Sequence, residues 1–331
     1  MTEAHRPTGR ITVLVTSPRV APGLLTRAAW QSLETAGEIA AAGGPERADV
    51  QAVIGSGLTV TKVEGGVGEH WSWLSSAAEA GRAVAWLVGD DGEPDLLHVV
   101  AAQVAREPRP PYEVEIVHGS YDVPGARLID LVRVMDRIRR DCAWTQQETH
   151  ESLAKYLLEE TYETLEALDT GDRAHLREEL GDLLLQVALN SRIAEEDPDD
   201  GFTIDDVAAG IVEKLVRRHP HVFGTVDATD VATVEANWEA IKATEKQRSS
   251  VLEGIPLALP ALALADKVLG RAAKLLPTDA PQPNPTTEAE RIGGDLLSTV
   301  REARAHGVDA EQALRTAVAA LADQVRAAEK T

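Results

Sequence analysis

The stretches LLEETYETLEAL (157–168) and HLREELGDLLLQVAL (175–189) decide how the centre of this chain folds. Both are rich in Leu, Glu and Ala, and both predict helices. Residues three or four apart share one face of a helix, so Glu160 lies beside Glu163 in the first stretch. The second stretch carries a similar pair of acids. The two stretches therefore predict consecutive helices that each present two carboxylates on one face.

The second acidic pair, Glu179 and Asp182, sits in an apolar helix. Ionised carboxylates in such surroundings are costly unless a cation offsets them. A hard divalent ion is the natural partner of carboxylate oxygens, and Mg²⁺ normally arrives carrying substrate phosphates. Gly181 costs roughly 0.5–1 kcal/mol relative to Ala inside a helix, which indicates that another backbone packs close to it. Acidic helix faces are usually only solvated, but two pairs on consecutive helices favour a metal site.

Composition narrows the classes of protein that fit. The chain has 331 residues, enough for two or three domains, and a formal net charge of −21, which argues against a general nucleic-acid binder. The single cysteine, Cys142, excludes an internal disulfide framework and fits a reducing cytoplasm. The N-terminus shows no signal peptide, and no apolar run approaches the ~20 residues of a membrane-spanning helix. We therefore expect a cytoplasmic protein with no membrane partner.

The pattern of predicted strands and helices changes near residue 120. Before it, short β-branched runs (11–17, 83–89 and 112–119) alternate with helical patterns (26–37 and 94–105), which predicts a small α/β domain over 1–118. After it, the pattern is helical and predicts an all-α bundle over 119–250, with helices expected over 127–140, 149–168, 173–195, 204–218 and 230–248. The tail, 251–331, predicts a helix over 257–276, a Pro-rich linker over 277–287 and a final Ala-rich helical stretch. The fold class expected is thus α/β followed by all-α.

Basic and aromatic residues follow the acidic helices. Lys214 and Arg218 are four residues apart on a predicted helix, with Arg217 near the same face. A purely structural explanation is that cations near the C-terminus of a helix interact favourably with the helix dipole. Trp238 and Lys242 are again four residues apart. An aromatic ring beside a cation is suited to bind a nucleotide base and a phosphate. A lone Trp on a helix is, however, more often part of a core.

These motifs, in this order, resemble the MazG nucleoside triphosphate pyrophosphohydrolases, which belong to the all-α NTP pyrophosphatase group. The resemblance covers roughly residues 124–250. It rests on four segments: DCAWTQQETHESLAKYLLEETYETLEAL, LREELGDLLLQVAL, KLVRRHPHVFG and NWEAIKATEK. It implies a dimeric helical bundle that uses Mg²⁺, or Mn²⁺ in its place, to hydrolyse an NTP or dNTP to the monophosphate and pyrophosphate, a role in housecleaning of the nucleotide pool.

The resemblance also assigns roles to residues. It implies four metal ligands: Glu160, Glu163, Glu179 and Asp182. It implies four further positions important for activity: Lys214, Arg218, Trp238 and Lys242. The family's Cys-Pro-Trp-Asp is here Cys-Ala-Trp-Thr over 142–145. This departure near Trp144 affects the expected selection of the base more than the expected metal binding.

The flanking regions resemble the family's wider organisation more faintly. Residues 254–277 and 293–318 look like pieces of a second, decayed copy of the domain, with Ile292 where the paired Glu would stand. We expect no metal site there. Residues 1–118 are faintly similar to a tetrapyrrole-methylase-like domain, too degenerate to assign methyl transfer.

The expected mechanism joins the carboxylates to the cations. Metal ions held by the acids would position the triphosphate and neutralise developing charge while a water attacks the α-phosphorus. Glu159 is the candidate for orienting or deprotonating that water. Three side chains would donate to the phosphates: Lys214, Arg218 and Lys242. Arg217, Trp144 and Trp238 complete the expected substrate contacts.

Two other functions stay open at this point. One is a non-catalytic, dimeric regulatory or interaction protein: the degraded flanks are typical of such a protein, whereas the intact acidic signature argues against it. A methyltransferase that uses the N-terminal domain is the third possibility. The sequence does not identify the substrate. A ribonucleotide or a deoxyribonucleotide, a normal or an oxidised nucleotide, and a guanosine alarmone all remain open.

Overall fold

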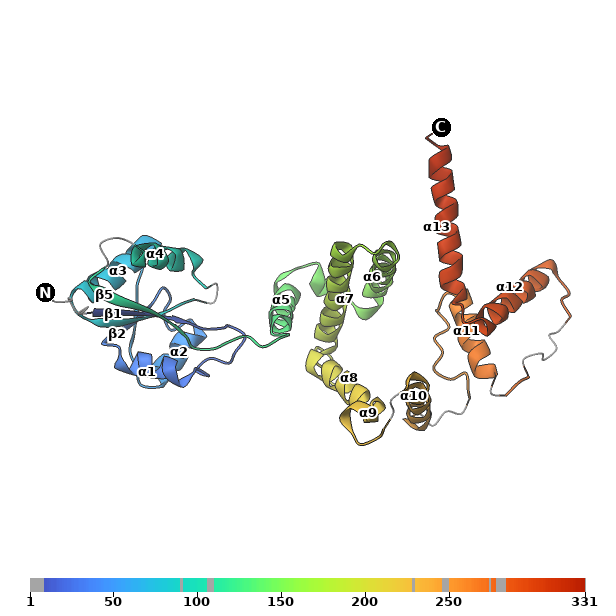
Figure 1. The fold of residues 1–331 in the computed structure, drawn as a ribbon, viewed down its shortest axis with the longest axis horizontal. Helices are drawn as coiled ribbons and strands as arrows, with labels where there is room; N and C mark the ends of the chain where they lie inside the picture. Colours follow the sequence, from blue (N-terminus) through green and yellow to red (C-terminus); the bar gives the residue numbers. More distant parts are fainter. Residues whose placement is uncertain are drawn as a thin grey trace. The chain divides into compact units, whose positions relative to one another are not determined.

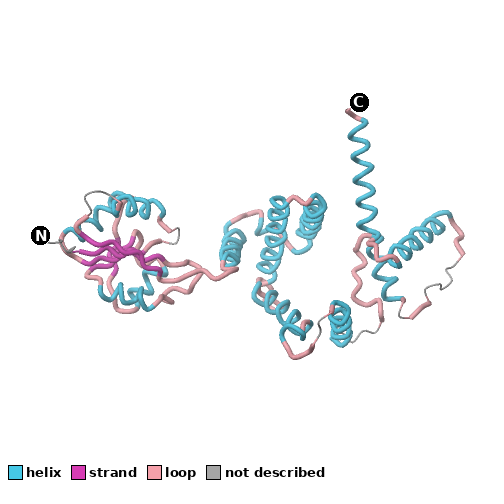
Figure 2. Tube along the Cα trace, viewed as in Figure 1, coloured by secondary structure: helices cyan, strands magenta, loops and turns pink. Residues whose placement is uncertain are grey.

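A computed structural model describes residues 9–89, 92–105, 110–227, 230–245, 250–273, 275–277 and 284–330. The chain divides into two compact units, Met1–Gly210 and Ile211–Thr331. The first unit holds a parallel sheet with its helices and then a set of helices, and the second is helical in every described element (Figures 1 and 2). This agrees with the predicted α/β region followed by a helical region. No described helix combines the length and the apolar character needed to cross a membrane.

The sheet has five parallel strands in the order β3-β2-β4-β1-β5. The strands are β1 (Gly9–Val15), β2 (Glu38–Ala41), β3 (Val60–Lys62), β4 (Ala83–Leu87) and β5 (Tyr112–His118). The helices between them are α1 (Arg27–Thr35), α2 (Ala48–Gly55), α3 (Val67–Glu79) and α4 (Pro94–Val104). The sequence predicted β1, β4, β5, α1 and α4, and all five are confirmed. The other four elements were not predicted.

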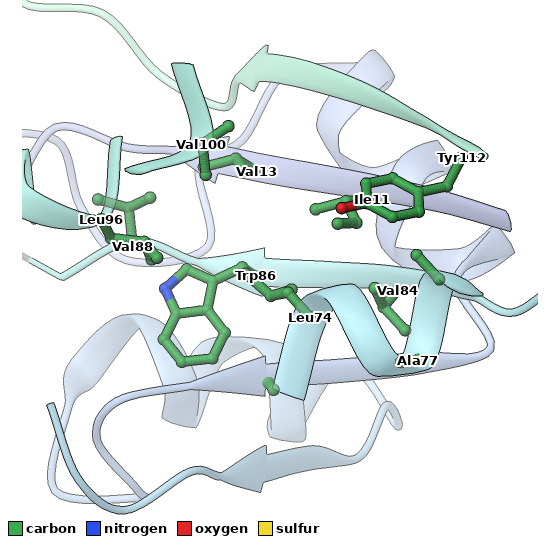
Figure 3. Packing of buried hydrophobic residues seen from close by; sticks show 12 residues of the cluster. Ile11, Val13, Leu74, Ala77, Val84, Trp86, Val88, Leu96, Val100 and Tyr112 are labelled. Atoms are coloured by element: carbon green, nitrogen blue, oxygen red, sulfur yellow. The ribbon is translucent and has the colours of Figure 1, made fainter. Parts of the chain in front are cut away.

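Two hydrophobic clusters hold helices to the two faces of the sheet. Ile11 and Val13 of β1 point into one cluster with α3 and α4, while Leu14 points into the other with α1 and α2. Figure 1 shows these two helix pairs on opposite sides of the strands. Trp86 is a fully buried member of the first cluster (Figure 3), and its Nε1 donates to Glu93 Oε2 at 2.8 Å. The sheet is buried on both faces, as parallel sheets usually are.

The helical part of the first unit begins after β5. Its elements are α5 (Arg127–Asp141), the 3₁₀ turn η1 (Thr145–Gln147), α6 (His150–Thr170), α7 (Arg173–Ala194) and the start of α8 (Ile204–Arg218). Gly171, at φ 71°, ends α6 in the left-handed conformation that glycine adopts at low cost. Asp172 then caps α7, because its Oδ1 accepts the backbone N–H of Ala174 at 2.9 Å. This tight connection makes α6 and α7 a helical hairpin.

A small core and a buried arginine hold the hairpin to α5. Leu153 of α6 packs with Met135 of α5 and Leu189 of α7. Arg139, 8% exposed, donates from Nε and Nη2 to the carboxylate of Glu196 at 2.9 and 2.8 Å. The predicted helices over 127–140, 149–168, 173–195 and 204–218 are confirmed to within two residues at each end.

The second unit continues from α8 with α9 (Pro220–Phe223), α10 (Val231–Glu245), α11 (Ala261–Ala272), α12 (Glu288–Ala305) and α13 (Ala310–Ala328). The helix expected over 257–276 is shorter, because Pro260 is the N-cap of α11 and a proline disfavours helical geometry in the residue before it. The final helical stretch is two helices, divided at Gly307 with φ 68°. Residues 278–283 of the expected linker lie outside the described residues, as do 246–248 of the helix expected to end at Arg248. The proposed division into domains 1–118, 119–250 and 251–331 stays a prediction.

Candidate metal centre

Three of the four predicted metal ligands come together between α6 and α7. Each of Glu160, Glu179 and Asp182 offers one carboxylate oxygen, and these oxygens all lie within 4.8 Å of one another. Glu160 comes from α6, and the other two come from the facing side of α7, where their three-residue spacing puts them on one face. The hairpin thus joins acids that are about twenty residues apart in the sequence.

Glu179 is the most buried member of the cluster, with 7% of its surface exposed. Its Oε1 lies 3.1 Å from His175 Nε2, one helical turn earlier. Its Oε2 is buried and has no hydrogen-bond partner among the described residues. Burial is the largest cause that raises the pKa of Glu179, followed by the carboxylate of Glu163, while His175 acts in the opposite direction. A buried carboxylate oxygen without a partner is costly, so this atom is suited to bind a cation.

Glu160 also has a raised pKa, and none of the main causes of its shift among the described residues is a basic side chain. Burial is the largest cause that raises its pKa above the ordinary value. Three carboxylates raise it further: Asp182, Glu163 and Glu179. The site therefore concentrates negative charge that only a cation or protons relieve.

The two other predicted acids, Glu163 and Glu159, are not among the three converging residues. Glu163 is exposed and is not one of the three converging residues, although a hydrogen bond between its side chain and Glu160 contributes to the raised pKa of Glu160. Glu159 is exposed on α6. The expectation of a close backbone at Gly181 is wrong for the described part of this chain: a Cβ built there meets no heavy atom within 4 Å. Gly181 lies about 100° around α7 from Asp182, which turns it away from the face that meets α6.

The donor set fits a hard divalent ion. Three carboxylates supply oxygen ligands, and the unpartnered Oε2 of Glu179 is the kind of atom that such an ion satisfies. Side-chain chemistry alone does not separate Mg²⁺ from Mn²⁺, because both accept carboxylate oxygens.

Trp144, one of the two tryptophans predicted to contact the substrate, lies beside the α6–α7 hairpin. Trp144 sits before η1 and is 53% exposed. Its ring meets Tyr156 of α6 edge to face, with centroids 6.2 Å apart. The exposed indole leaves a flat apolar surface next to the helix that carries Glu160.

The predicted cations lie in the second unit, where two of them already have a partner. Arg217 Nε donates to Glu245 Oε1 at 2.8 Å, and Arg218 Nε donates to both oxygens of Glu245 at 3.2 and 3.1 Å. These hydrogen bonds, first that from Arg218, lower the pKa of Glu245 from 4.5 to about 2. Arg218 also lies over the Trp238 ring, 5.3 Å from its centroid.

The two remaining predicted cations are lysines. Lys242 Nζ lies 3.0 Å from Glu239 Oε1, and Lys214 is exposed on α8. His219 packs edge to face on Trp238 with centroids 4.8 Å apart, so this tryptophan is packed among residues of its own unit. The prediction that these cations and the acidic cluster form one substrate site stays a prediction.

Sequence reasoning did not single out two residues that matter for these contacts. His175 holds Glu179, and its spacing of four residues from a predicted ligand was the signal that would have found it. Glu245 holds two predicted phosphate donors, but it lies 27 residues beyond Arg218, and no local pattern joins the two.

Comparison with known proteins places both acidic helices in one family. Residues 148–223 match the MazG nucleotide pyrophosphohydrolase domain. An uncharacterised 26.1 kDa protein of Streptomyces cacaoi is 49% identical over 240 residues, which are 72% of this chain and 98% of that protein.

Two further relatives carry names that describe an activity. The nucleoside triphosphate pyrophosphohydrolase of Mycobacterium tuberculosis is 45% identical over 207 residues, 62% of this chain but only 59% of that protein. The nucleoside triphosphate pyrophosphohydrolase/pyrophosphatase MazG of Thermotoga maritima is 38% identical over 209 residues, 57% of this chain and 80% of that protein. Because the alignment covers four fifths of the Thermotoga protein and the domain match includes both acid-bearing helices, the chain belongs to the MazG nucleotide pyrophosphohydrolase family.

Proposed function

We propose that this protein hydrolyses nucleoside triphosphates, ribo or deoxy, to the monophosphate and pyrophosphate with the help of Mg²⁺, or of Mn²⁺ as a substitute. The observation that carries the proposal is the convergence of Glu160, Glu179 and Asp182, with one buried oxygen of Glu179 left without a partner. The named activity of the mycobacterial and Thermotoga relatives supports it. The physiological role proposed is housecleaning of the nucleotide pool.

The four acids would hold the ion, with Glu163 joining the three converging residues. A divalent ion bound there would neutralise charge on the phosphates and lower the pKa of an attacking water. Glu159, exposed on α6, is proposed to orient or deprotonate that water. Its exposure gives it access to solvent, which a general base acting on water requires.

The cations of the second unit are proposed as phosphate donors. Lys214 and Lys242 would act as point charges, and Arg217 and Arg218 would offer planar forks that suit phosphate oxygens. Both arginines now bind the carboxylate of Glu245, so a phosphate would have to take the place of that carboxylate.

The aromatic residues are proposed to contact the base. Trp144 offers an exposed ring, whereas the ring of Trp238 is already covered in part by Arg218. Stacking on an exposed indole is tolerant of the identity of the base, so Trp144 would support binding of several nucleotides rather than one.

A homodimer is part of the proposal. Large apolar side chains are exposed along α6 and α7, among them Leu157, Leu158, Leu180, Leu184 and Val187. Contiguous exposed apolar surface is typical of protein interfaces. The helical hairpin would therefore bury this surface against a second copy of the chain.

A panel of ribo- and deoxynucleoside triphosphates tests the proposed function. Wild-type protein should release one pyrophosphate and one monophosphate per triphosphate with Mg²⁺. D182A should lose more than about 100-fold of that rate, since loss of a residue that only orients a metal ligand already costs about 10–100-fold. Glu195→Gln is the matched control, because this exposed acid follows Asp182 by thirteen residues, about 20 Å along the helix direction. A protein that releases no pyrophosphate from any nucleotide with Mg²⁺ or Mn²⁺ would favour the alternative, a non-catalytic dimeric regulatory protein.

A further inference from the structure

The proposed function gives no role to His175, whose imidazole contacts Glu179. His175 is in the first turn of α7, and its backbone N–H donates to the Asp172 cap at 3.2 Å. Its Nε2 lies 3.1 Å from Glu179 Oε1. Side chains on a helix lean toward its N-terminus, so Glu179 reaches back toward the imidazole one turn earlier.

The two oxygens of Glu179 are in different situations. Oε1 has the imidazole as its partner, whereas Oε2 is buried and has no hydrogen-bond partner among the described residues. A carboxylate held at one oxygen loses most of its freedom to rotate. Oε2 is then the oxygen left to meet a cation, in a carboxylate that converges with those of Glu160 and Asp182.

We propose that His175 is a positioning residue that holds Glu179 by Oε1 so that Oε2 is ready to bind the divalent ion. This inference rests on the proposed function for the identity of the ion, and it deepens that function by adding a residue outside the ligand set. The imidazole tautomer with its proton on Nε2 donates to Oε1. His175 touches neither the ion nor the substrate and acts only through Glu179.

Removing the imidazole should therefore weaken metal binding. H175A leaves Glu179 free to rotate and both of its oxygens without a partner in a buried position. Partners that orient metal ligands typically account for 10–100-fold in metal affinity, so the dissociation constant for Mn²⁺ should rise at least about tenfold. H175Q should recover part of the loss, because its amide nitrogen reaches the position of Nε2. H175N is too short to reach that position and should behave like H175A.

The experiment measures Mn²⁺ binding to the full chain without nucleotide, from the electron paramagnetic resonance signal of the free ion. His150→Ala is the matched control. His150 also joins α6 to α7, since its Nδ1 lies 2.8 Å from Asn190 Oδ1, but it is ten residues from Glu160, about 15 Å along the helix. The proposal expects the order wild type and H150A tightest, H175Q intermediate, H175N and H175A weakest.

Several outcomes would overturn the proposal. These are wild-type affinity in H175A, equal affinities in H175Q and H175N, or an equal loss in H150A. Failure of the wild type to bind Mn²⁺ would overturn it too, because Oε2 of Glu179 would then not be a metal ligand. If H175A does not fold, the comparison of H175Q with H175N still decides.

Kinetics supply a second readout and separate this inference from the proposed function. In H175A the Mg²⁺ concentration for half-maximal rate should rise at least about tenfold, while the rate at saturating Mg²⁺ changes much less. A general loss of structure would lower both. If the wild type hydrolyses no nucleotide, the proposed function fails, and the Mn²⁺ measurements still test the role of His175.

Discussion

Glu160 gives the plainest support for the proposed cation in the acidic cluster. Its side chain is half-buried, and within the described part of the chain the charged groups that shift its pKa are all acids: Asp182, Glu163 and Glu179. A solvated acid on a helix face would keep its ordinary pKa. The raised pKa of Glu160 means that folding works against its charge, and a bound divalent ion would reverse the sign of that contribution.

The raised pKa predicts how stability depends on pH. A carboxyl group whose pKa is higher in the folded state binds protons more strongly there, so stability falls as pH rises from the ordinary value of 4.5 through the folded value. E160Q removes this penalty. Without metal at pH 8, its melting temperature should exceed that of the wild type, and the gap should close as pH falls toward 4.5. Added Mg²⁺ should raise the melting temperature of the wild type more than that of E160Q. A less stable E160Q at pH 8 without metal would contradict this reading.

Glu245 predicts the opposite dependence. Its pKa is lowered from 4.5 to about 2, chiefly by the hydrogen bonds from Arg218 and then Arg217. The stability that it contributes is fully present above 4.5 and is lost as pH falls through 2. E245Q should therefore melt at a lower temperature than the wild type at pH 7, and the difference should shrink below pH 4.5. Glu213→Gln, an exposed acid on α8, is the control. Equal melting temperatures at pH 7 would show that the ion pair does not stabilise the fold.

At the scale of elements, the α6–α7 hairpin is the part that builds the site. Its register is set by the short connection at Gly171 and Asp172 and by the core around Leu153, which is 1% exposed. A shift of either helix along its axis would separate Glu160 from the acids of α7. The packing of apolar residues thus fixes the distance between carboxylates that repel one another.

Truncation of this core should loosen the hairpin. L153A should destabilise the protein by about 2–5 kcal/mol, the usual cost of a large-to-small change at a buried leucine. Glu166→Ala, an exposed position on the same helix, should stay within about 0.5 kcal/mol of the wild type. Urea unfolding followed by circular dichroism measures both. A change below about 1 kcal/mol in L153A would show that the cluster with Met135 and Leu189 is not a core.

The sequence predicted the long elements well because a helix of fifteen or more residues repeats its apolar pattern several times. Strands β2 and β3 have four and three residues, too few for a period to be read. The helix α11 was predicted too long because apolar residues continue on both sides of it, while Pro260 sets its start. Local steric rules therefore overrode hydrophobic pattern at that boundary.

The site was predicted in part for a related reason. Spacing on each helix put the acids in pairs, and the hairpin brings Glu160 to Glu179 and Asp182 as expected. Spacing could not show which acid would be most buried, nor that Arg218 would be bound to Glu245, because both depend on how distant segments pack. Gly181 was misread because a helix glycine has several explanations, and open space beside it is one of them.

At the scale of the whole molecule, the exposed apolar residues of α6 and α7 predict assembly. A charge placed among them should oppose burial against a second copy. L158E should shift the mass measured by light scattering from two chains toward one, because Leu158 is 56% exposed and burying a glutamate there is costly. Glu195→Gln should leave the mass unchanged. A wild-type protein with the mass of one chain at all concentrations would remove the proposed homodimer.

The proposed activity depends on a divalent ion held between α6 and α7. The most direct measurement is anomalous scattering from crystals grown with Mn²⁺ and a non-hydrolysable triphosphate analogue. We predict an anomalous peak within coordination distance of Glu160, Glu179 and Asp182, with triphosphate oxygens beside it. Ordered crystals in which these carboxylates carry no peak, while Mn²⁺ and the analogue bind elsewhere, would contradict it.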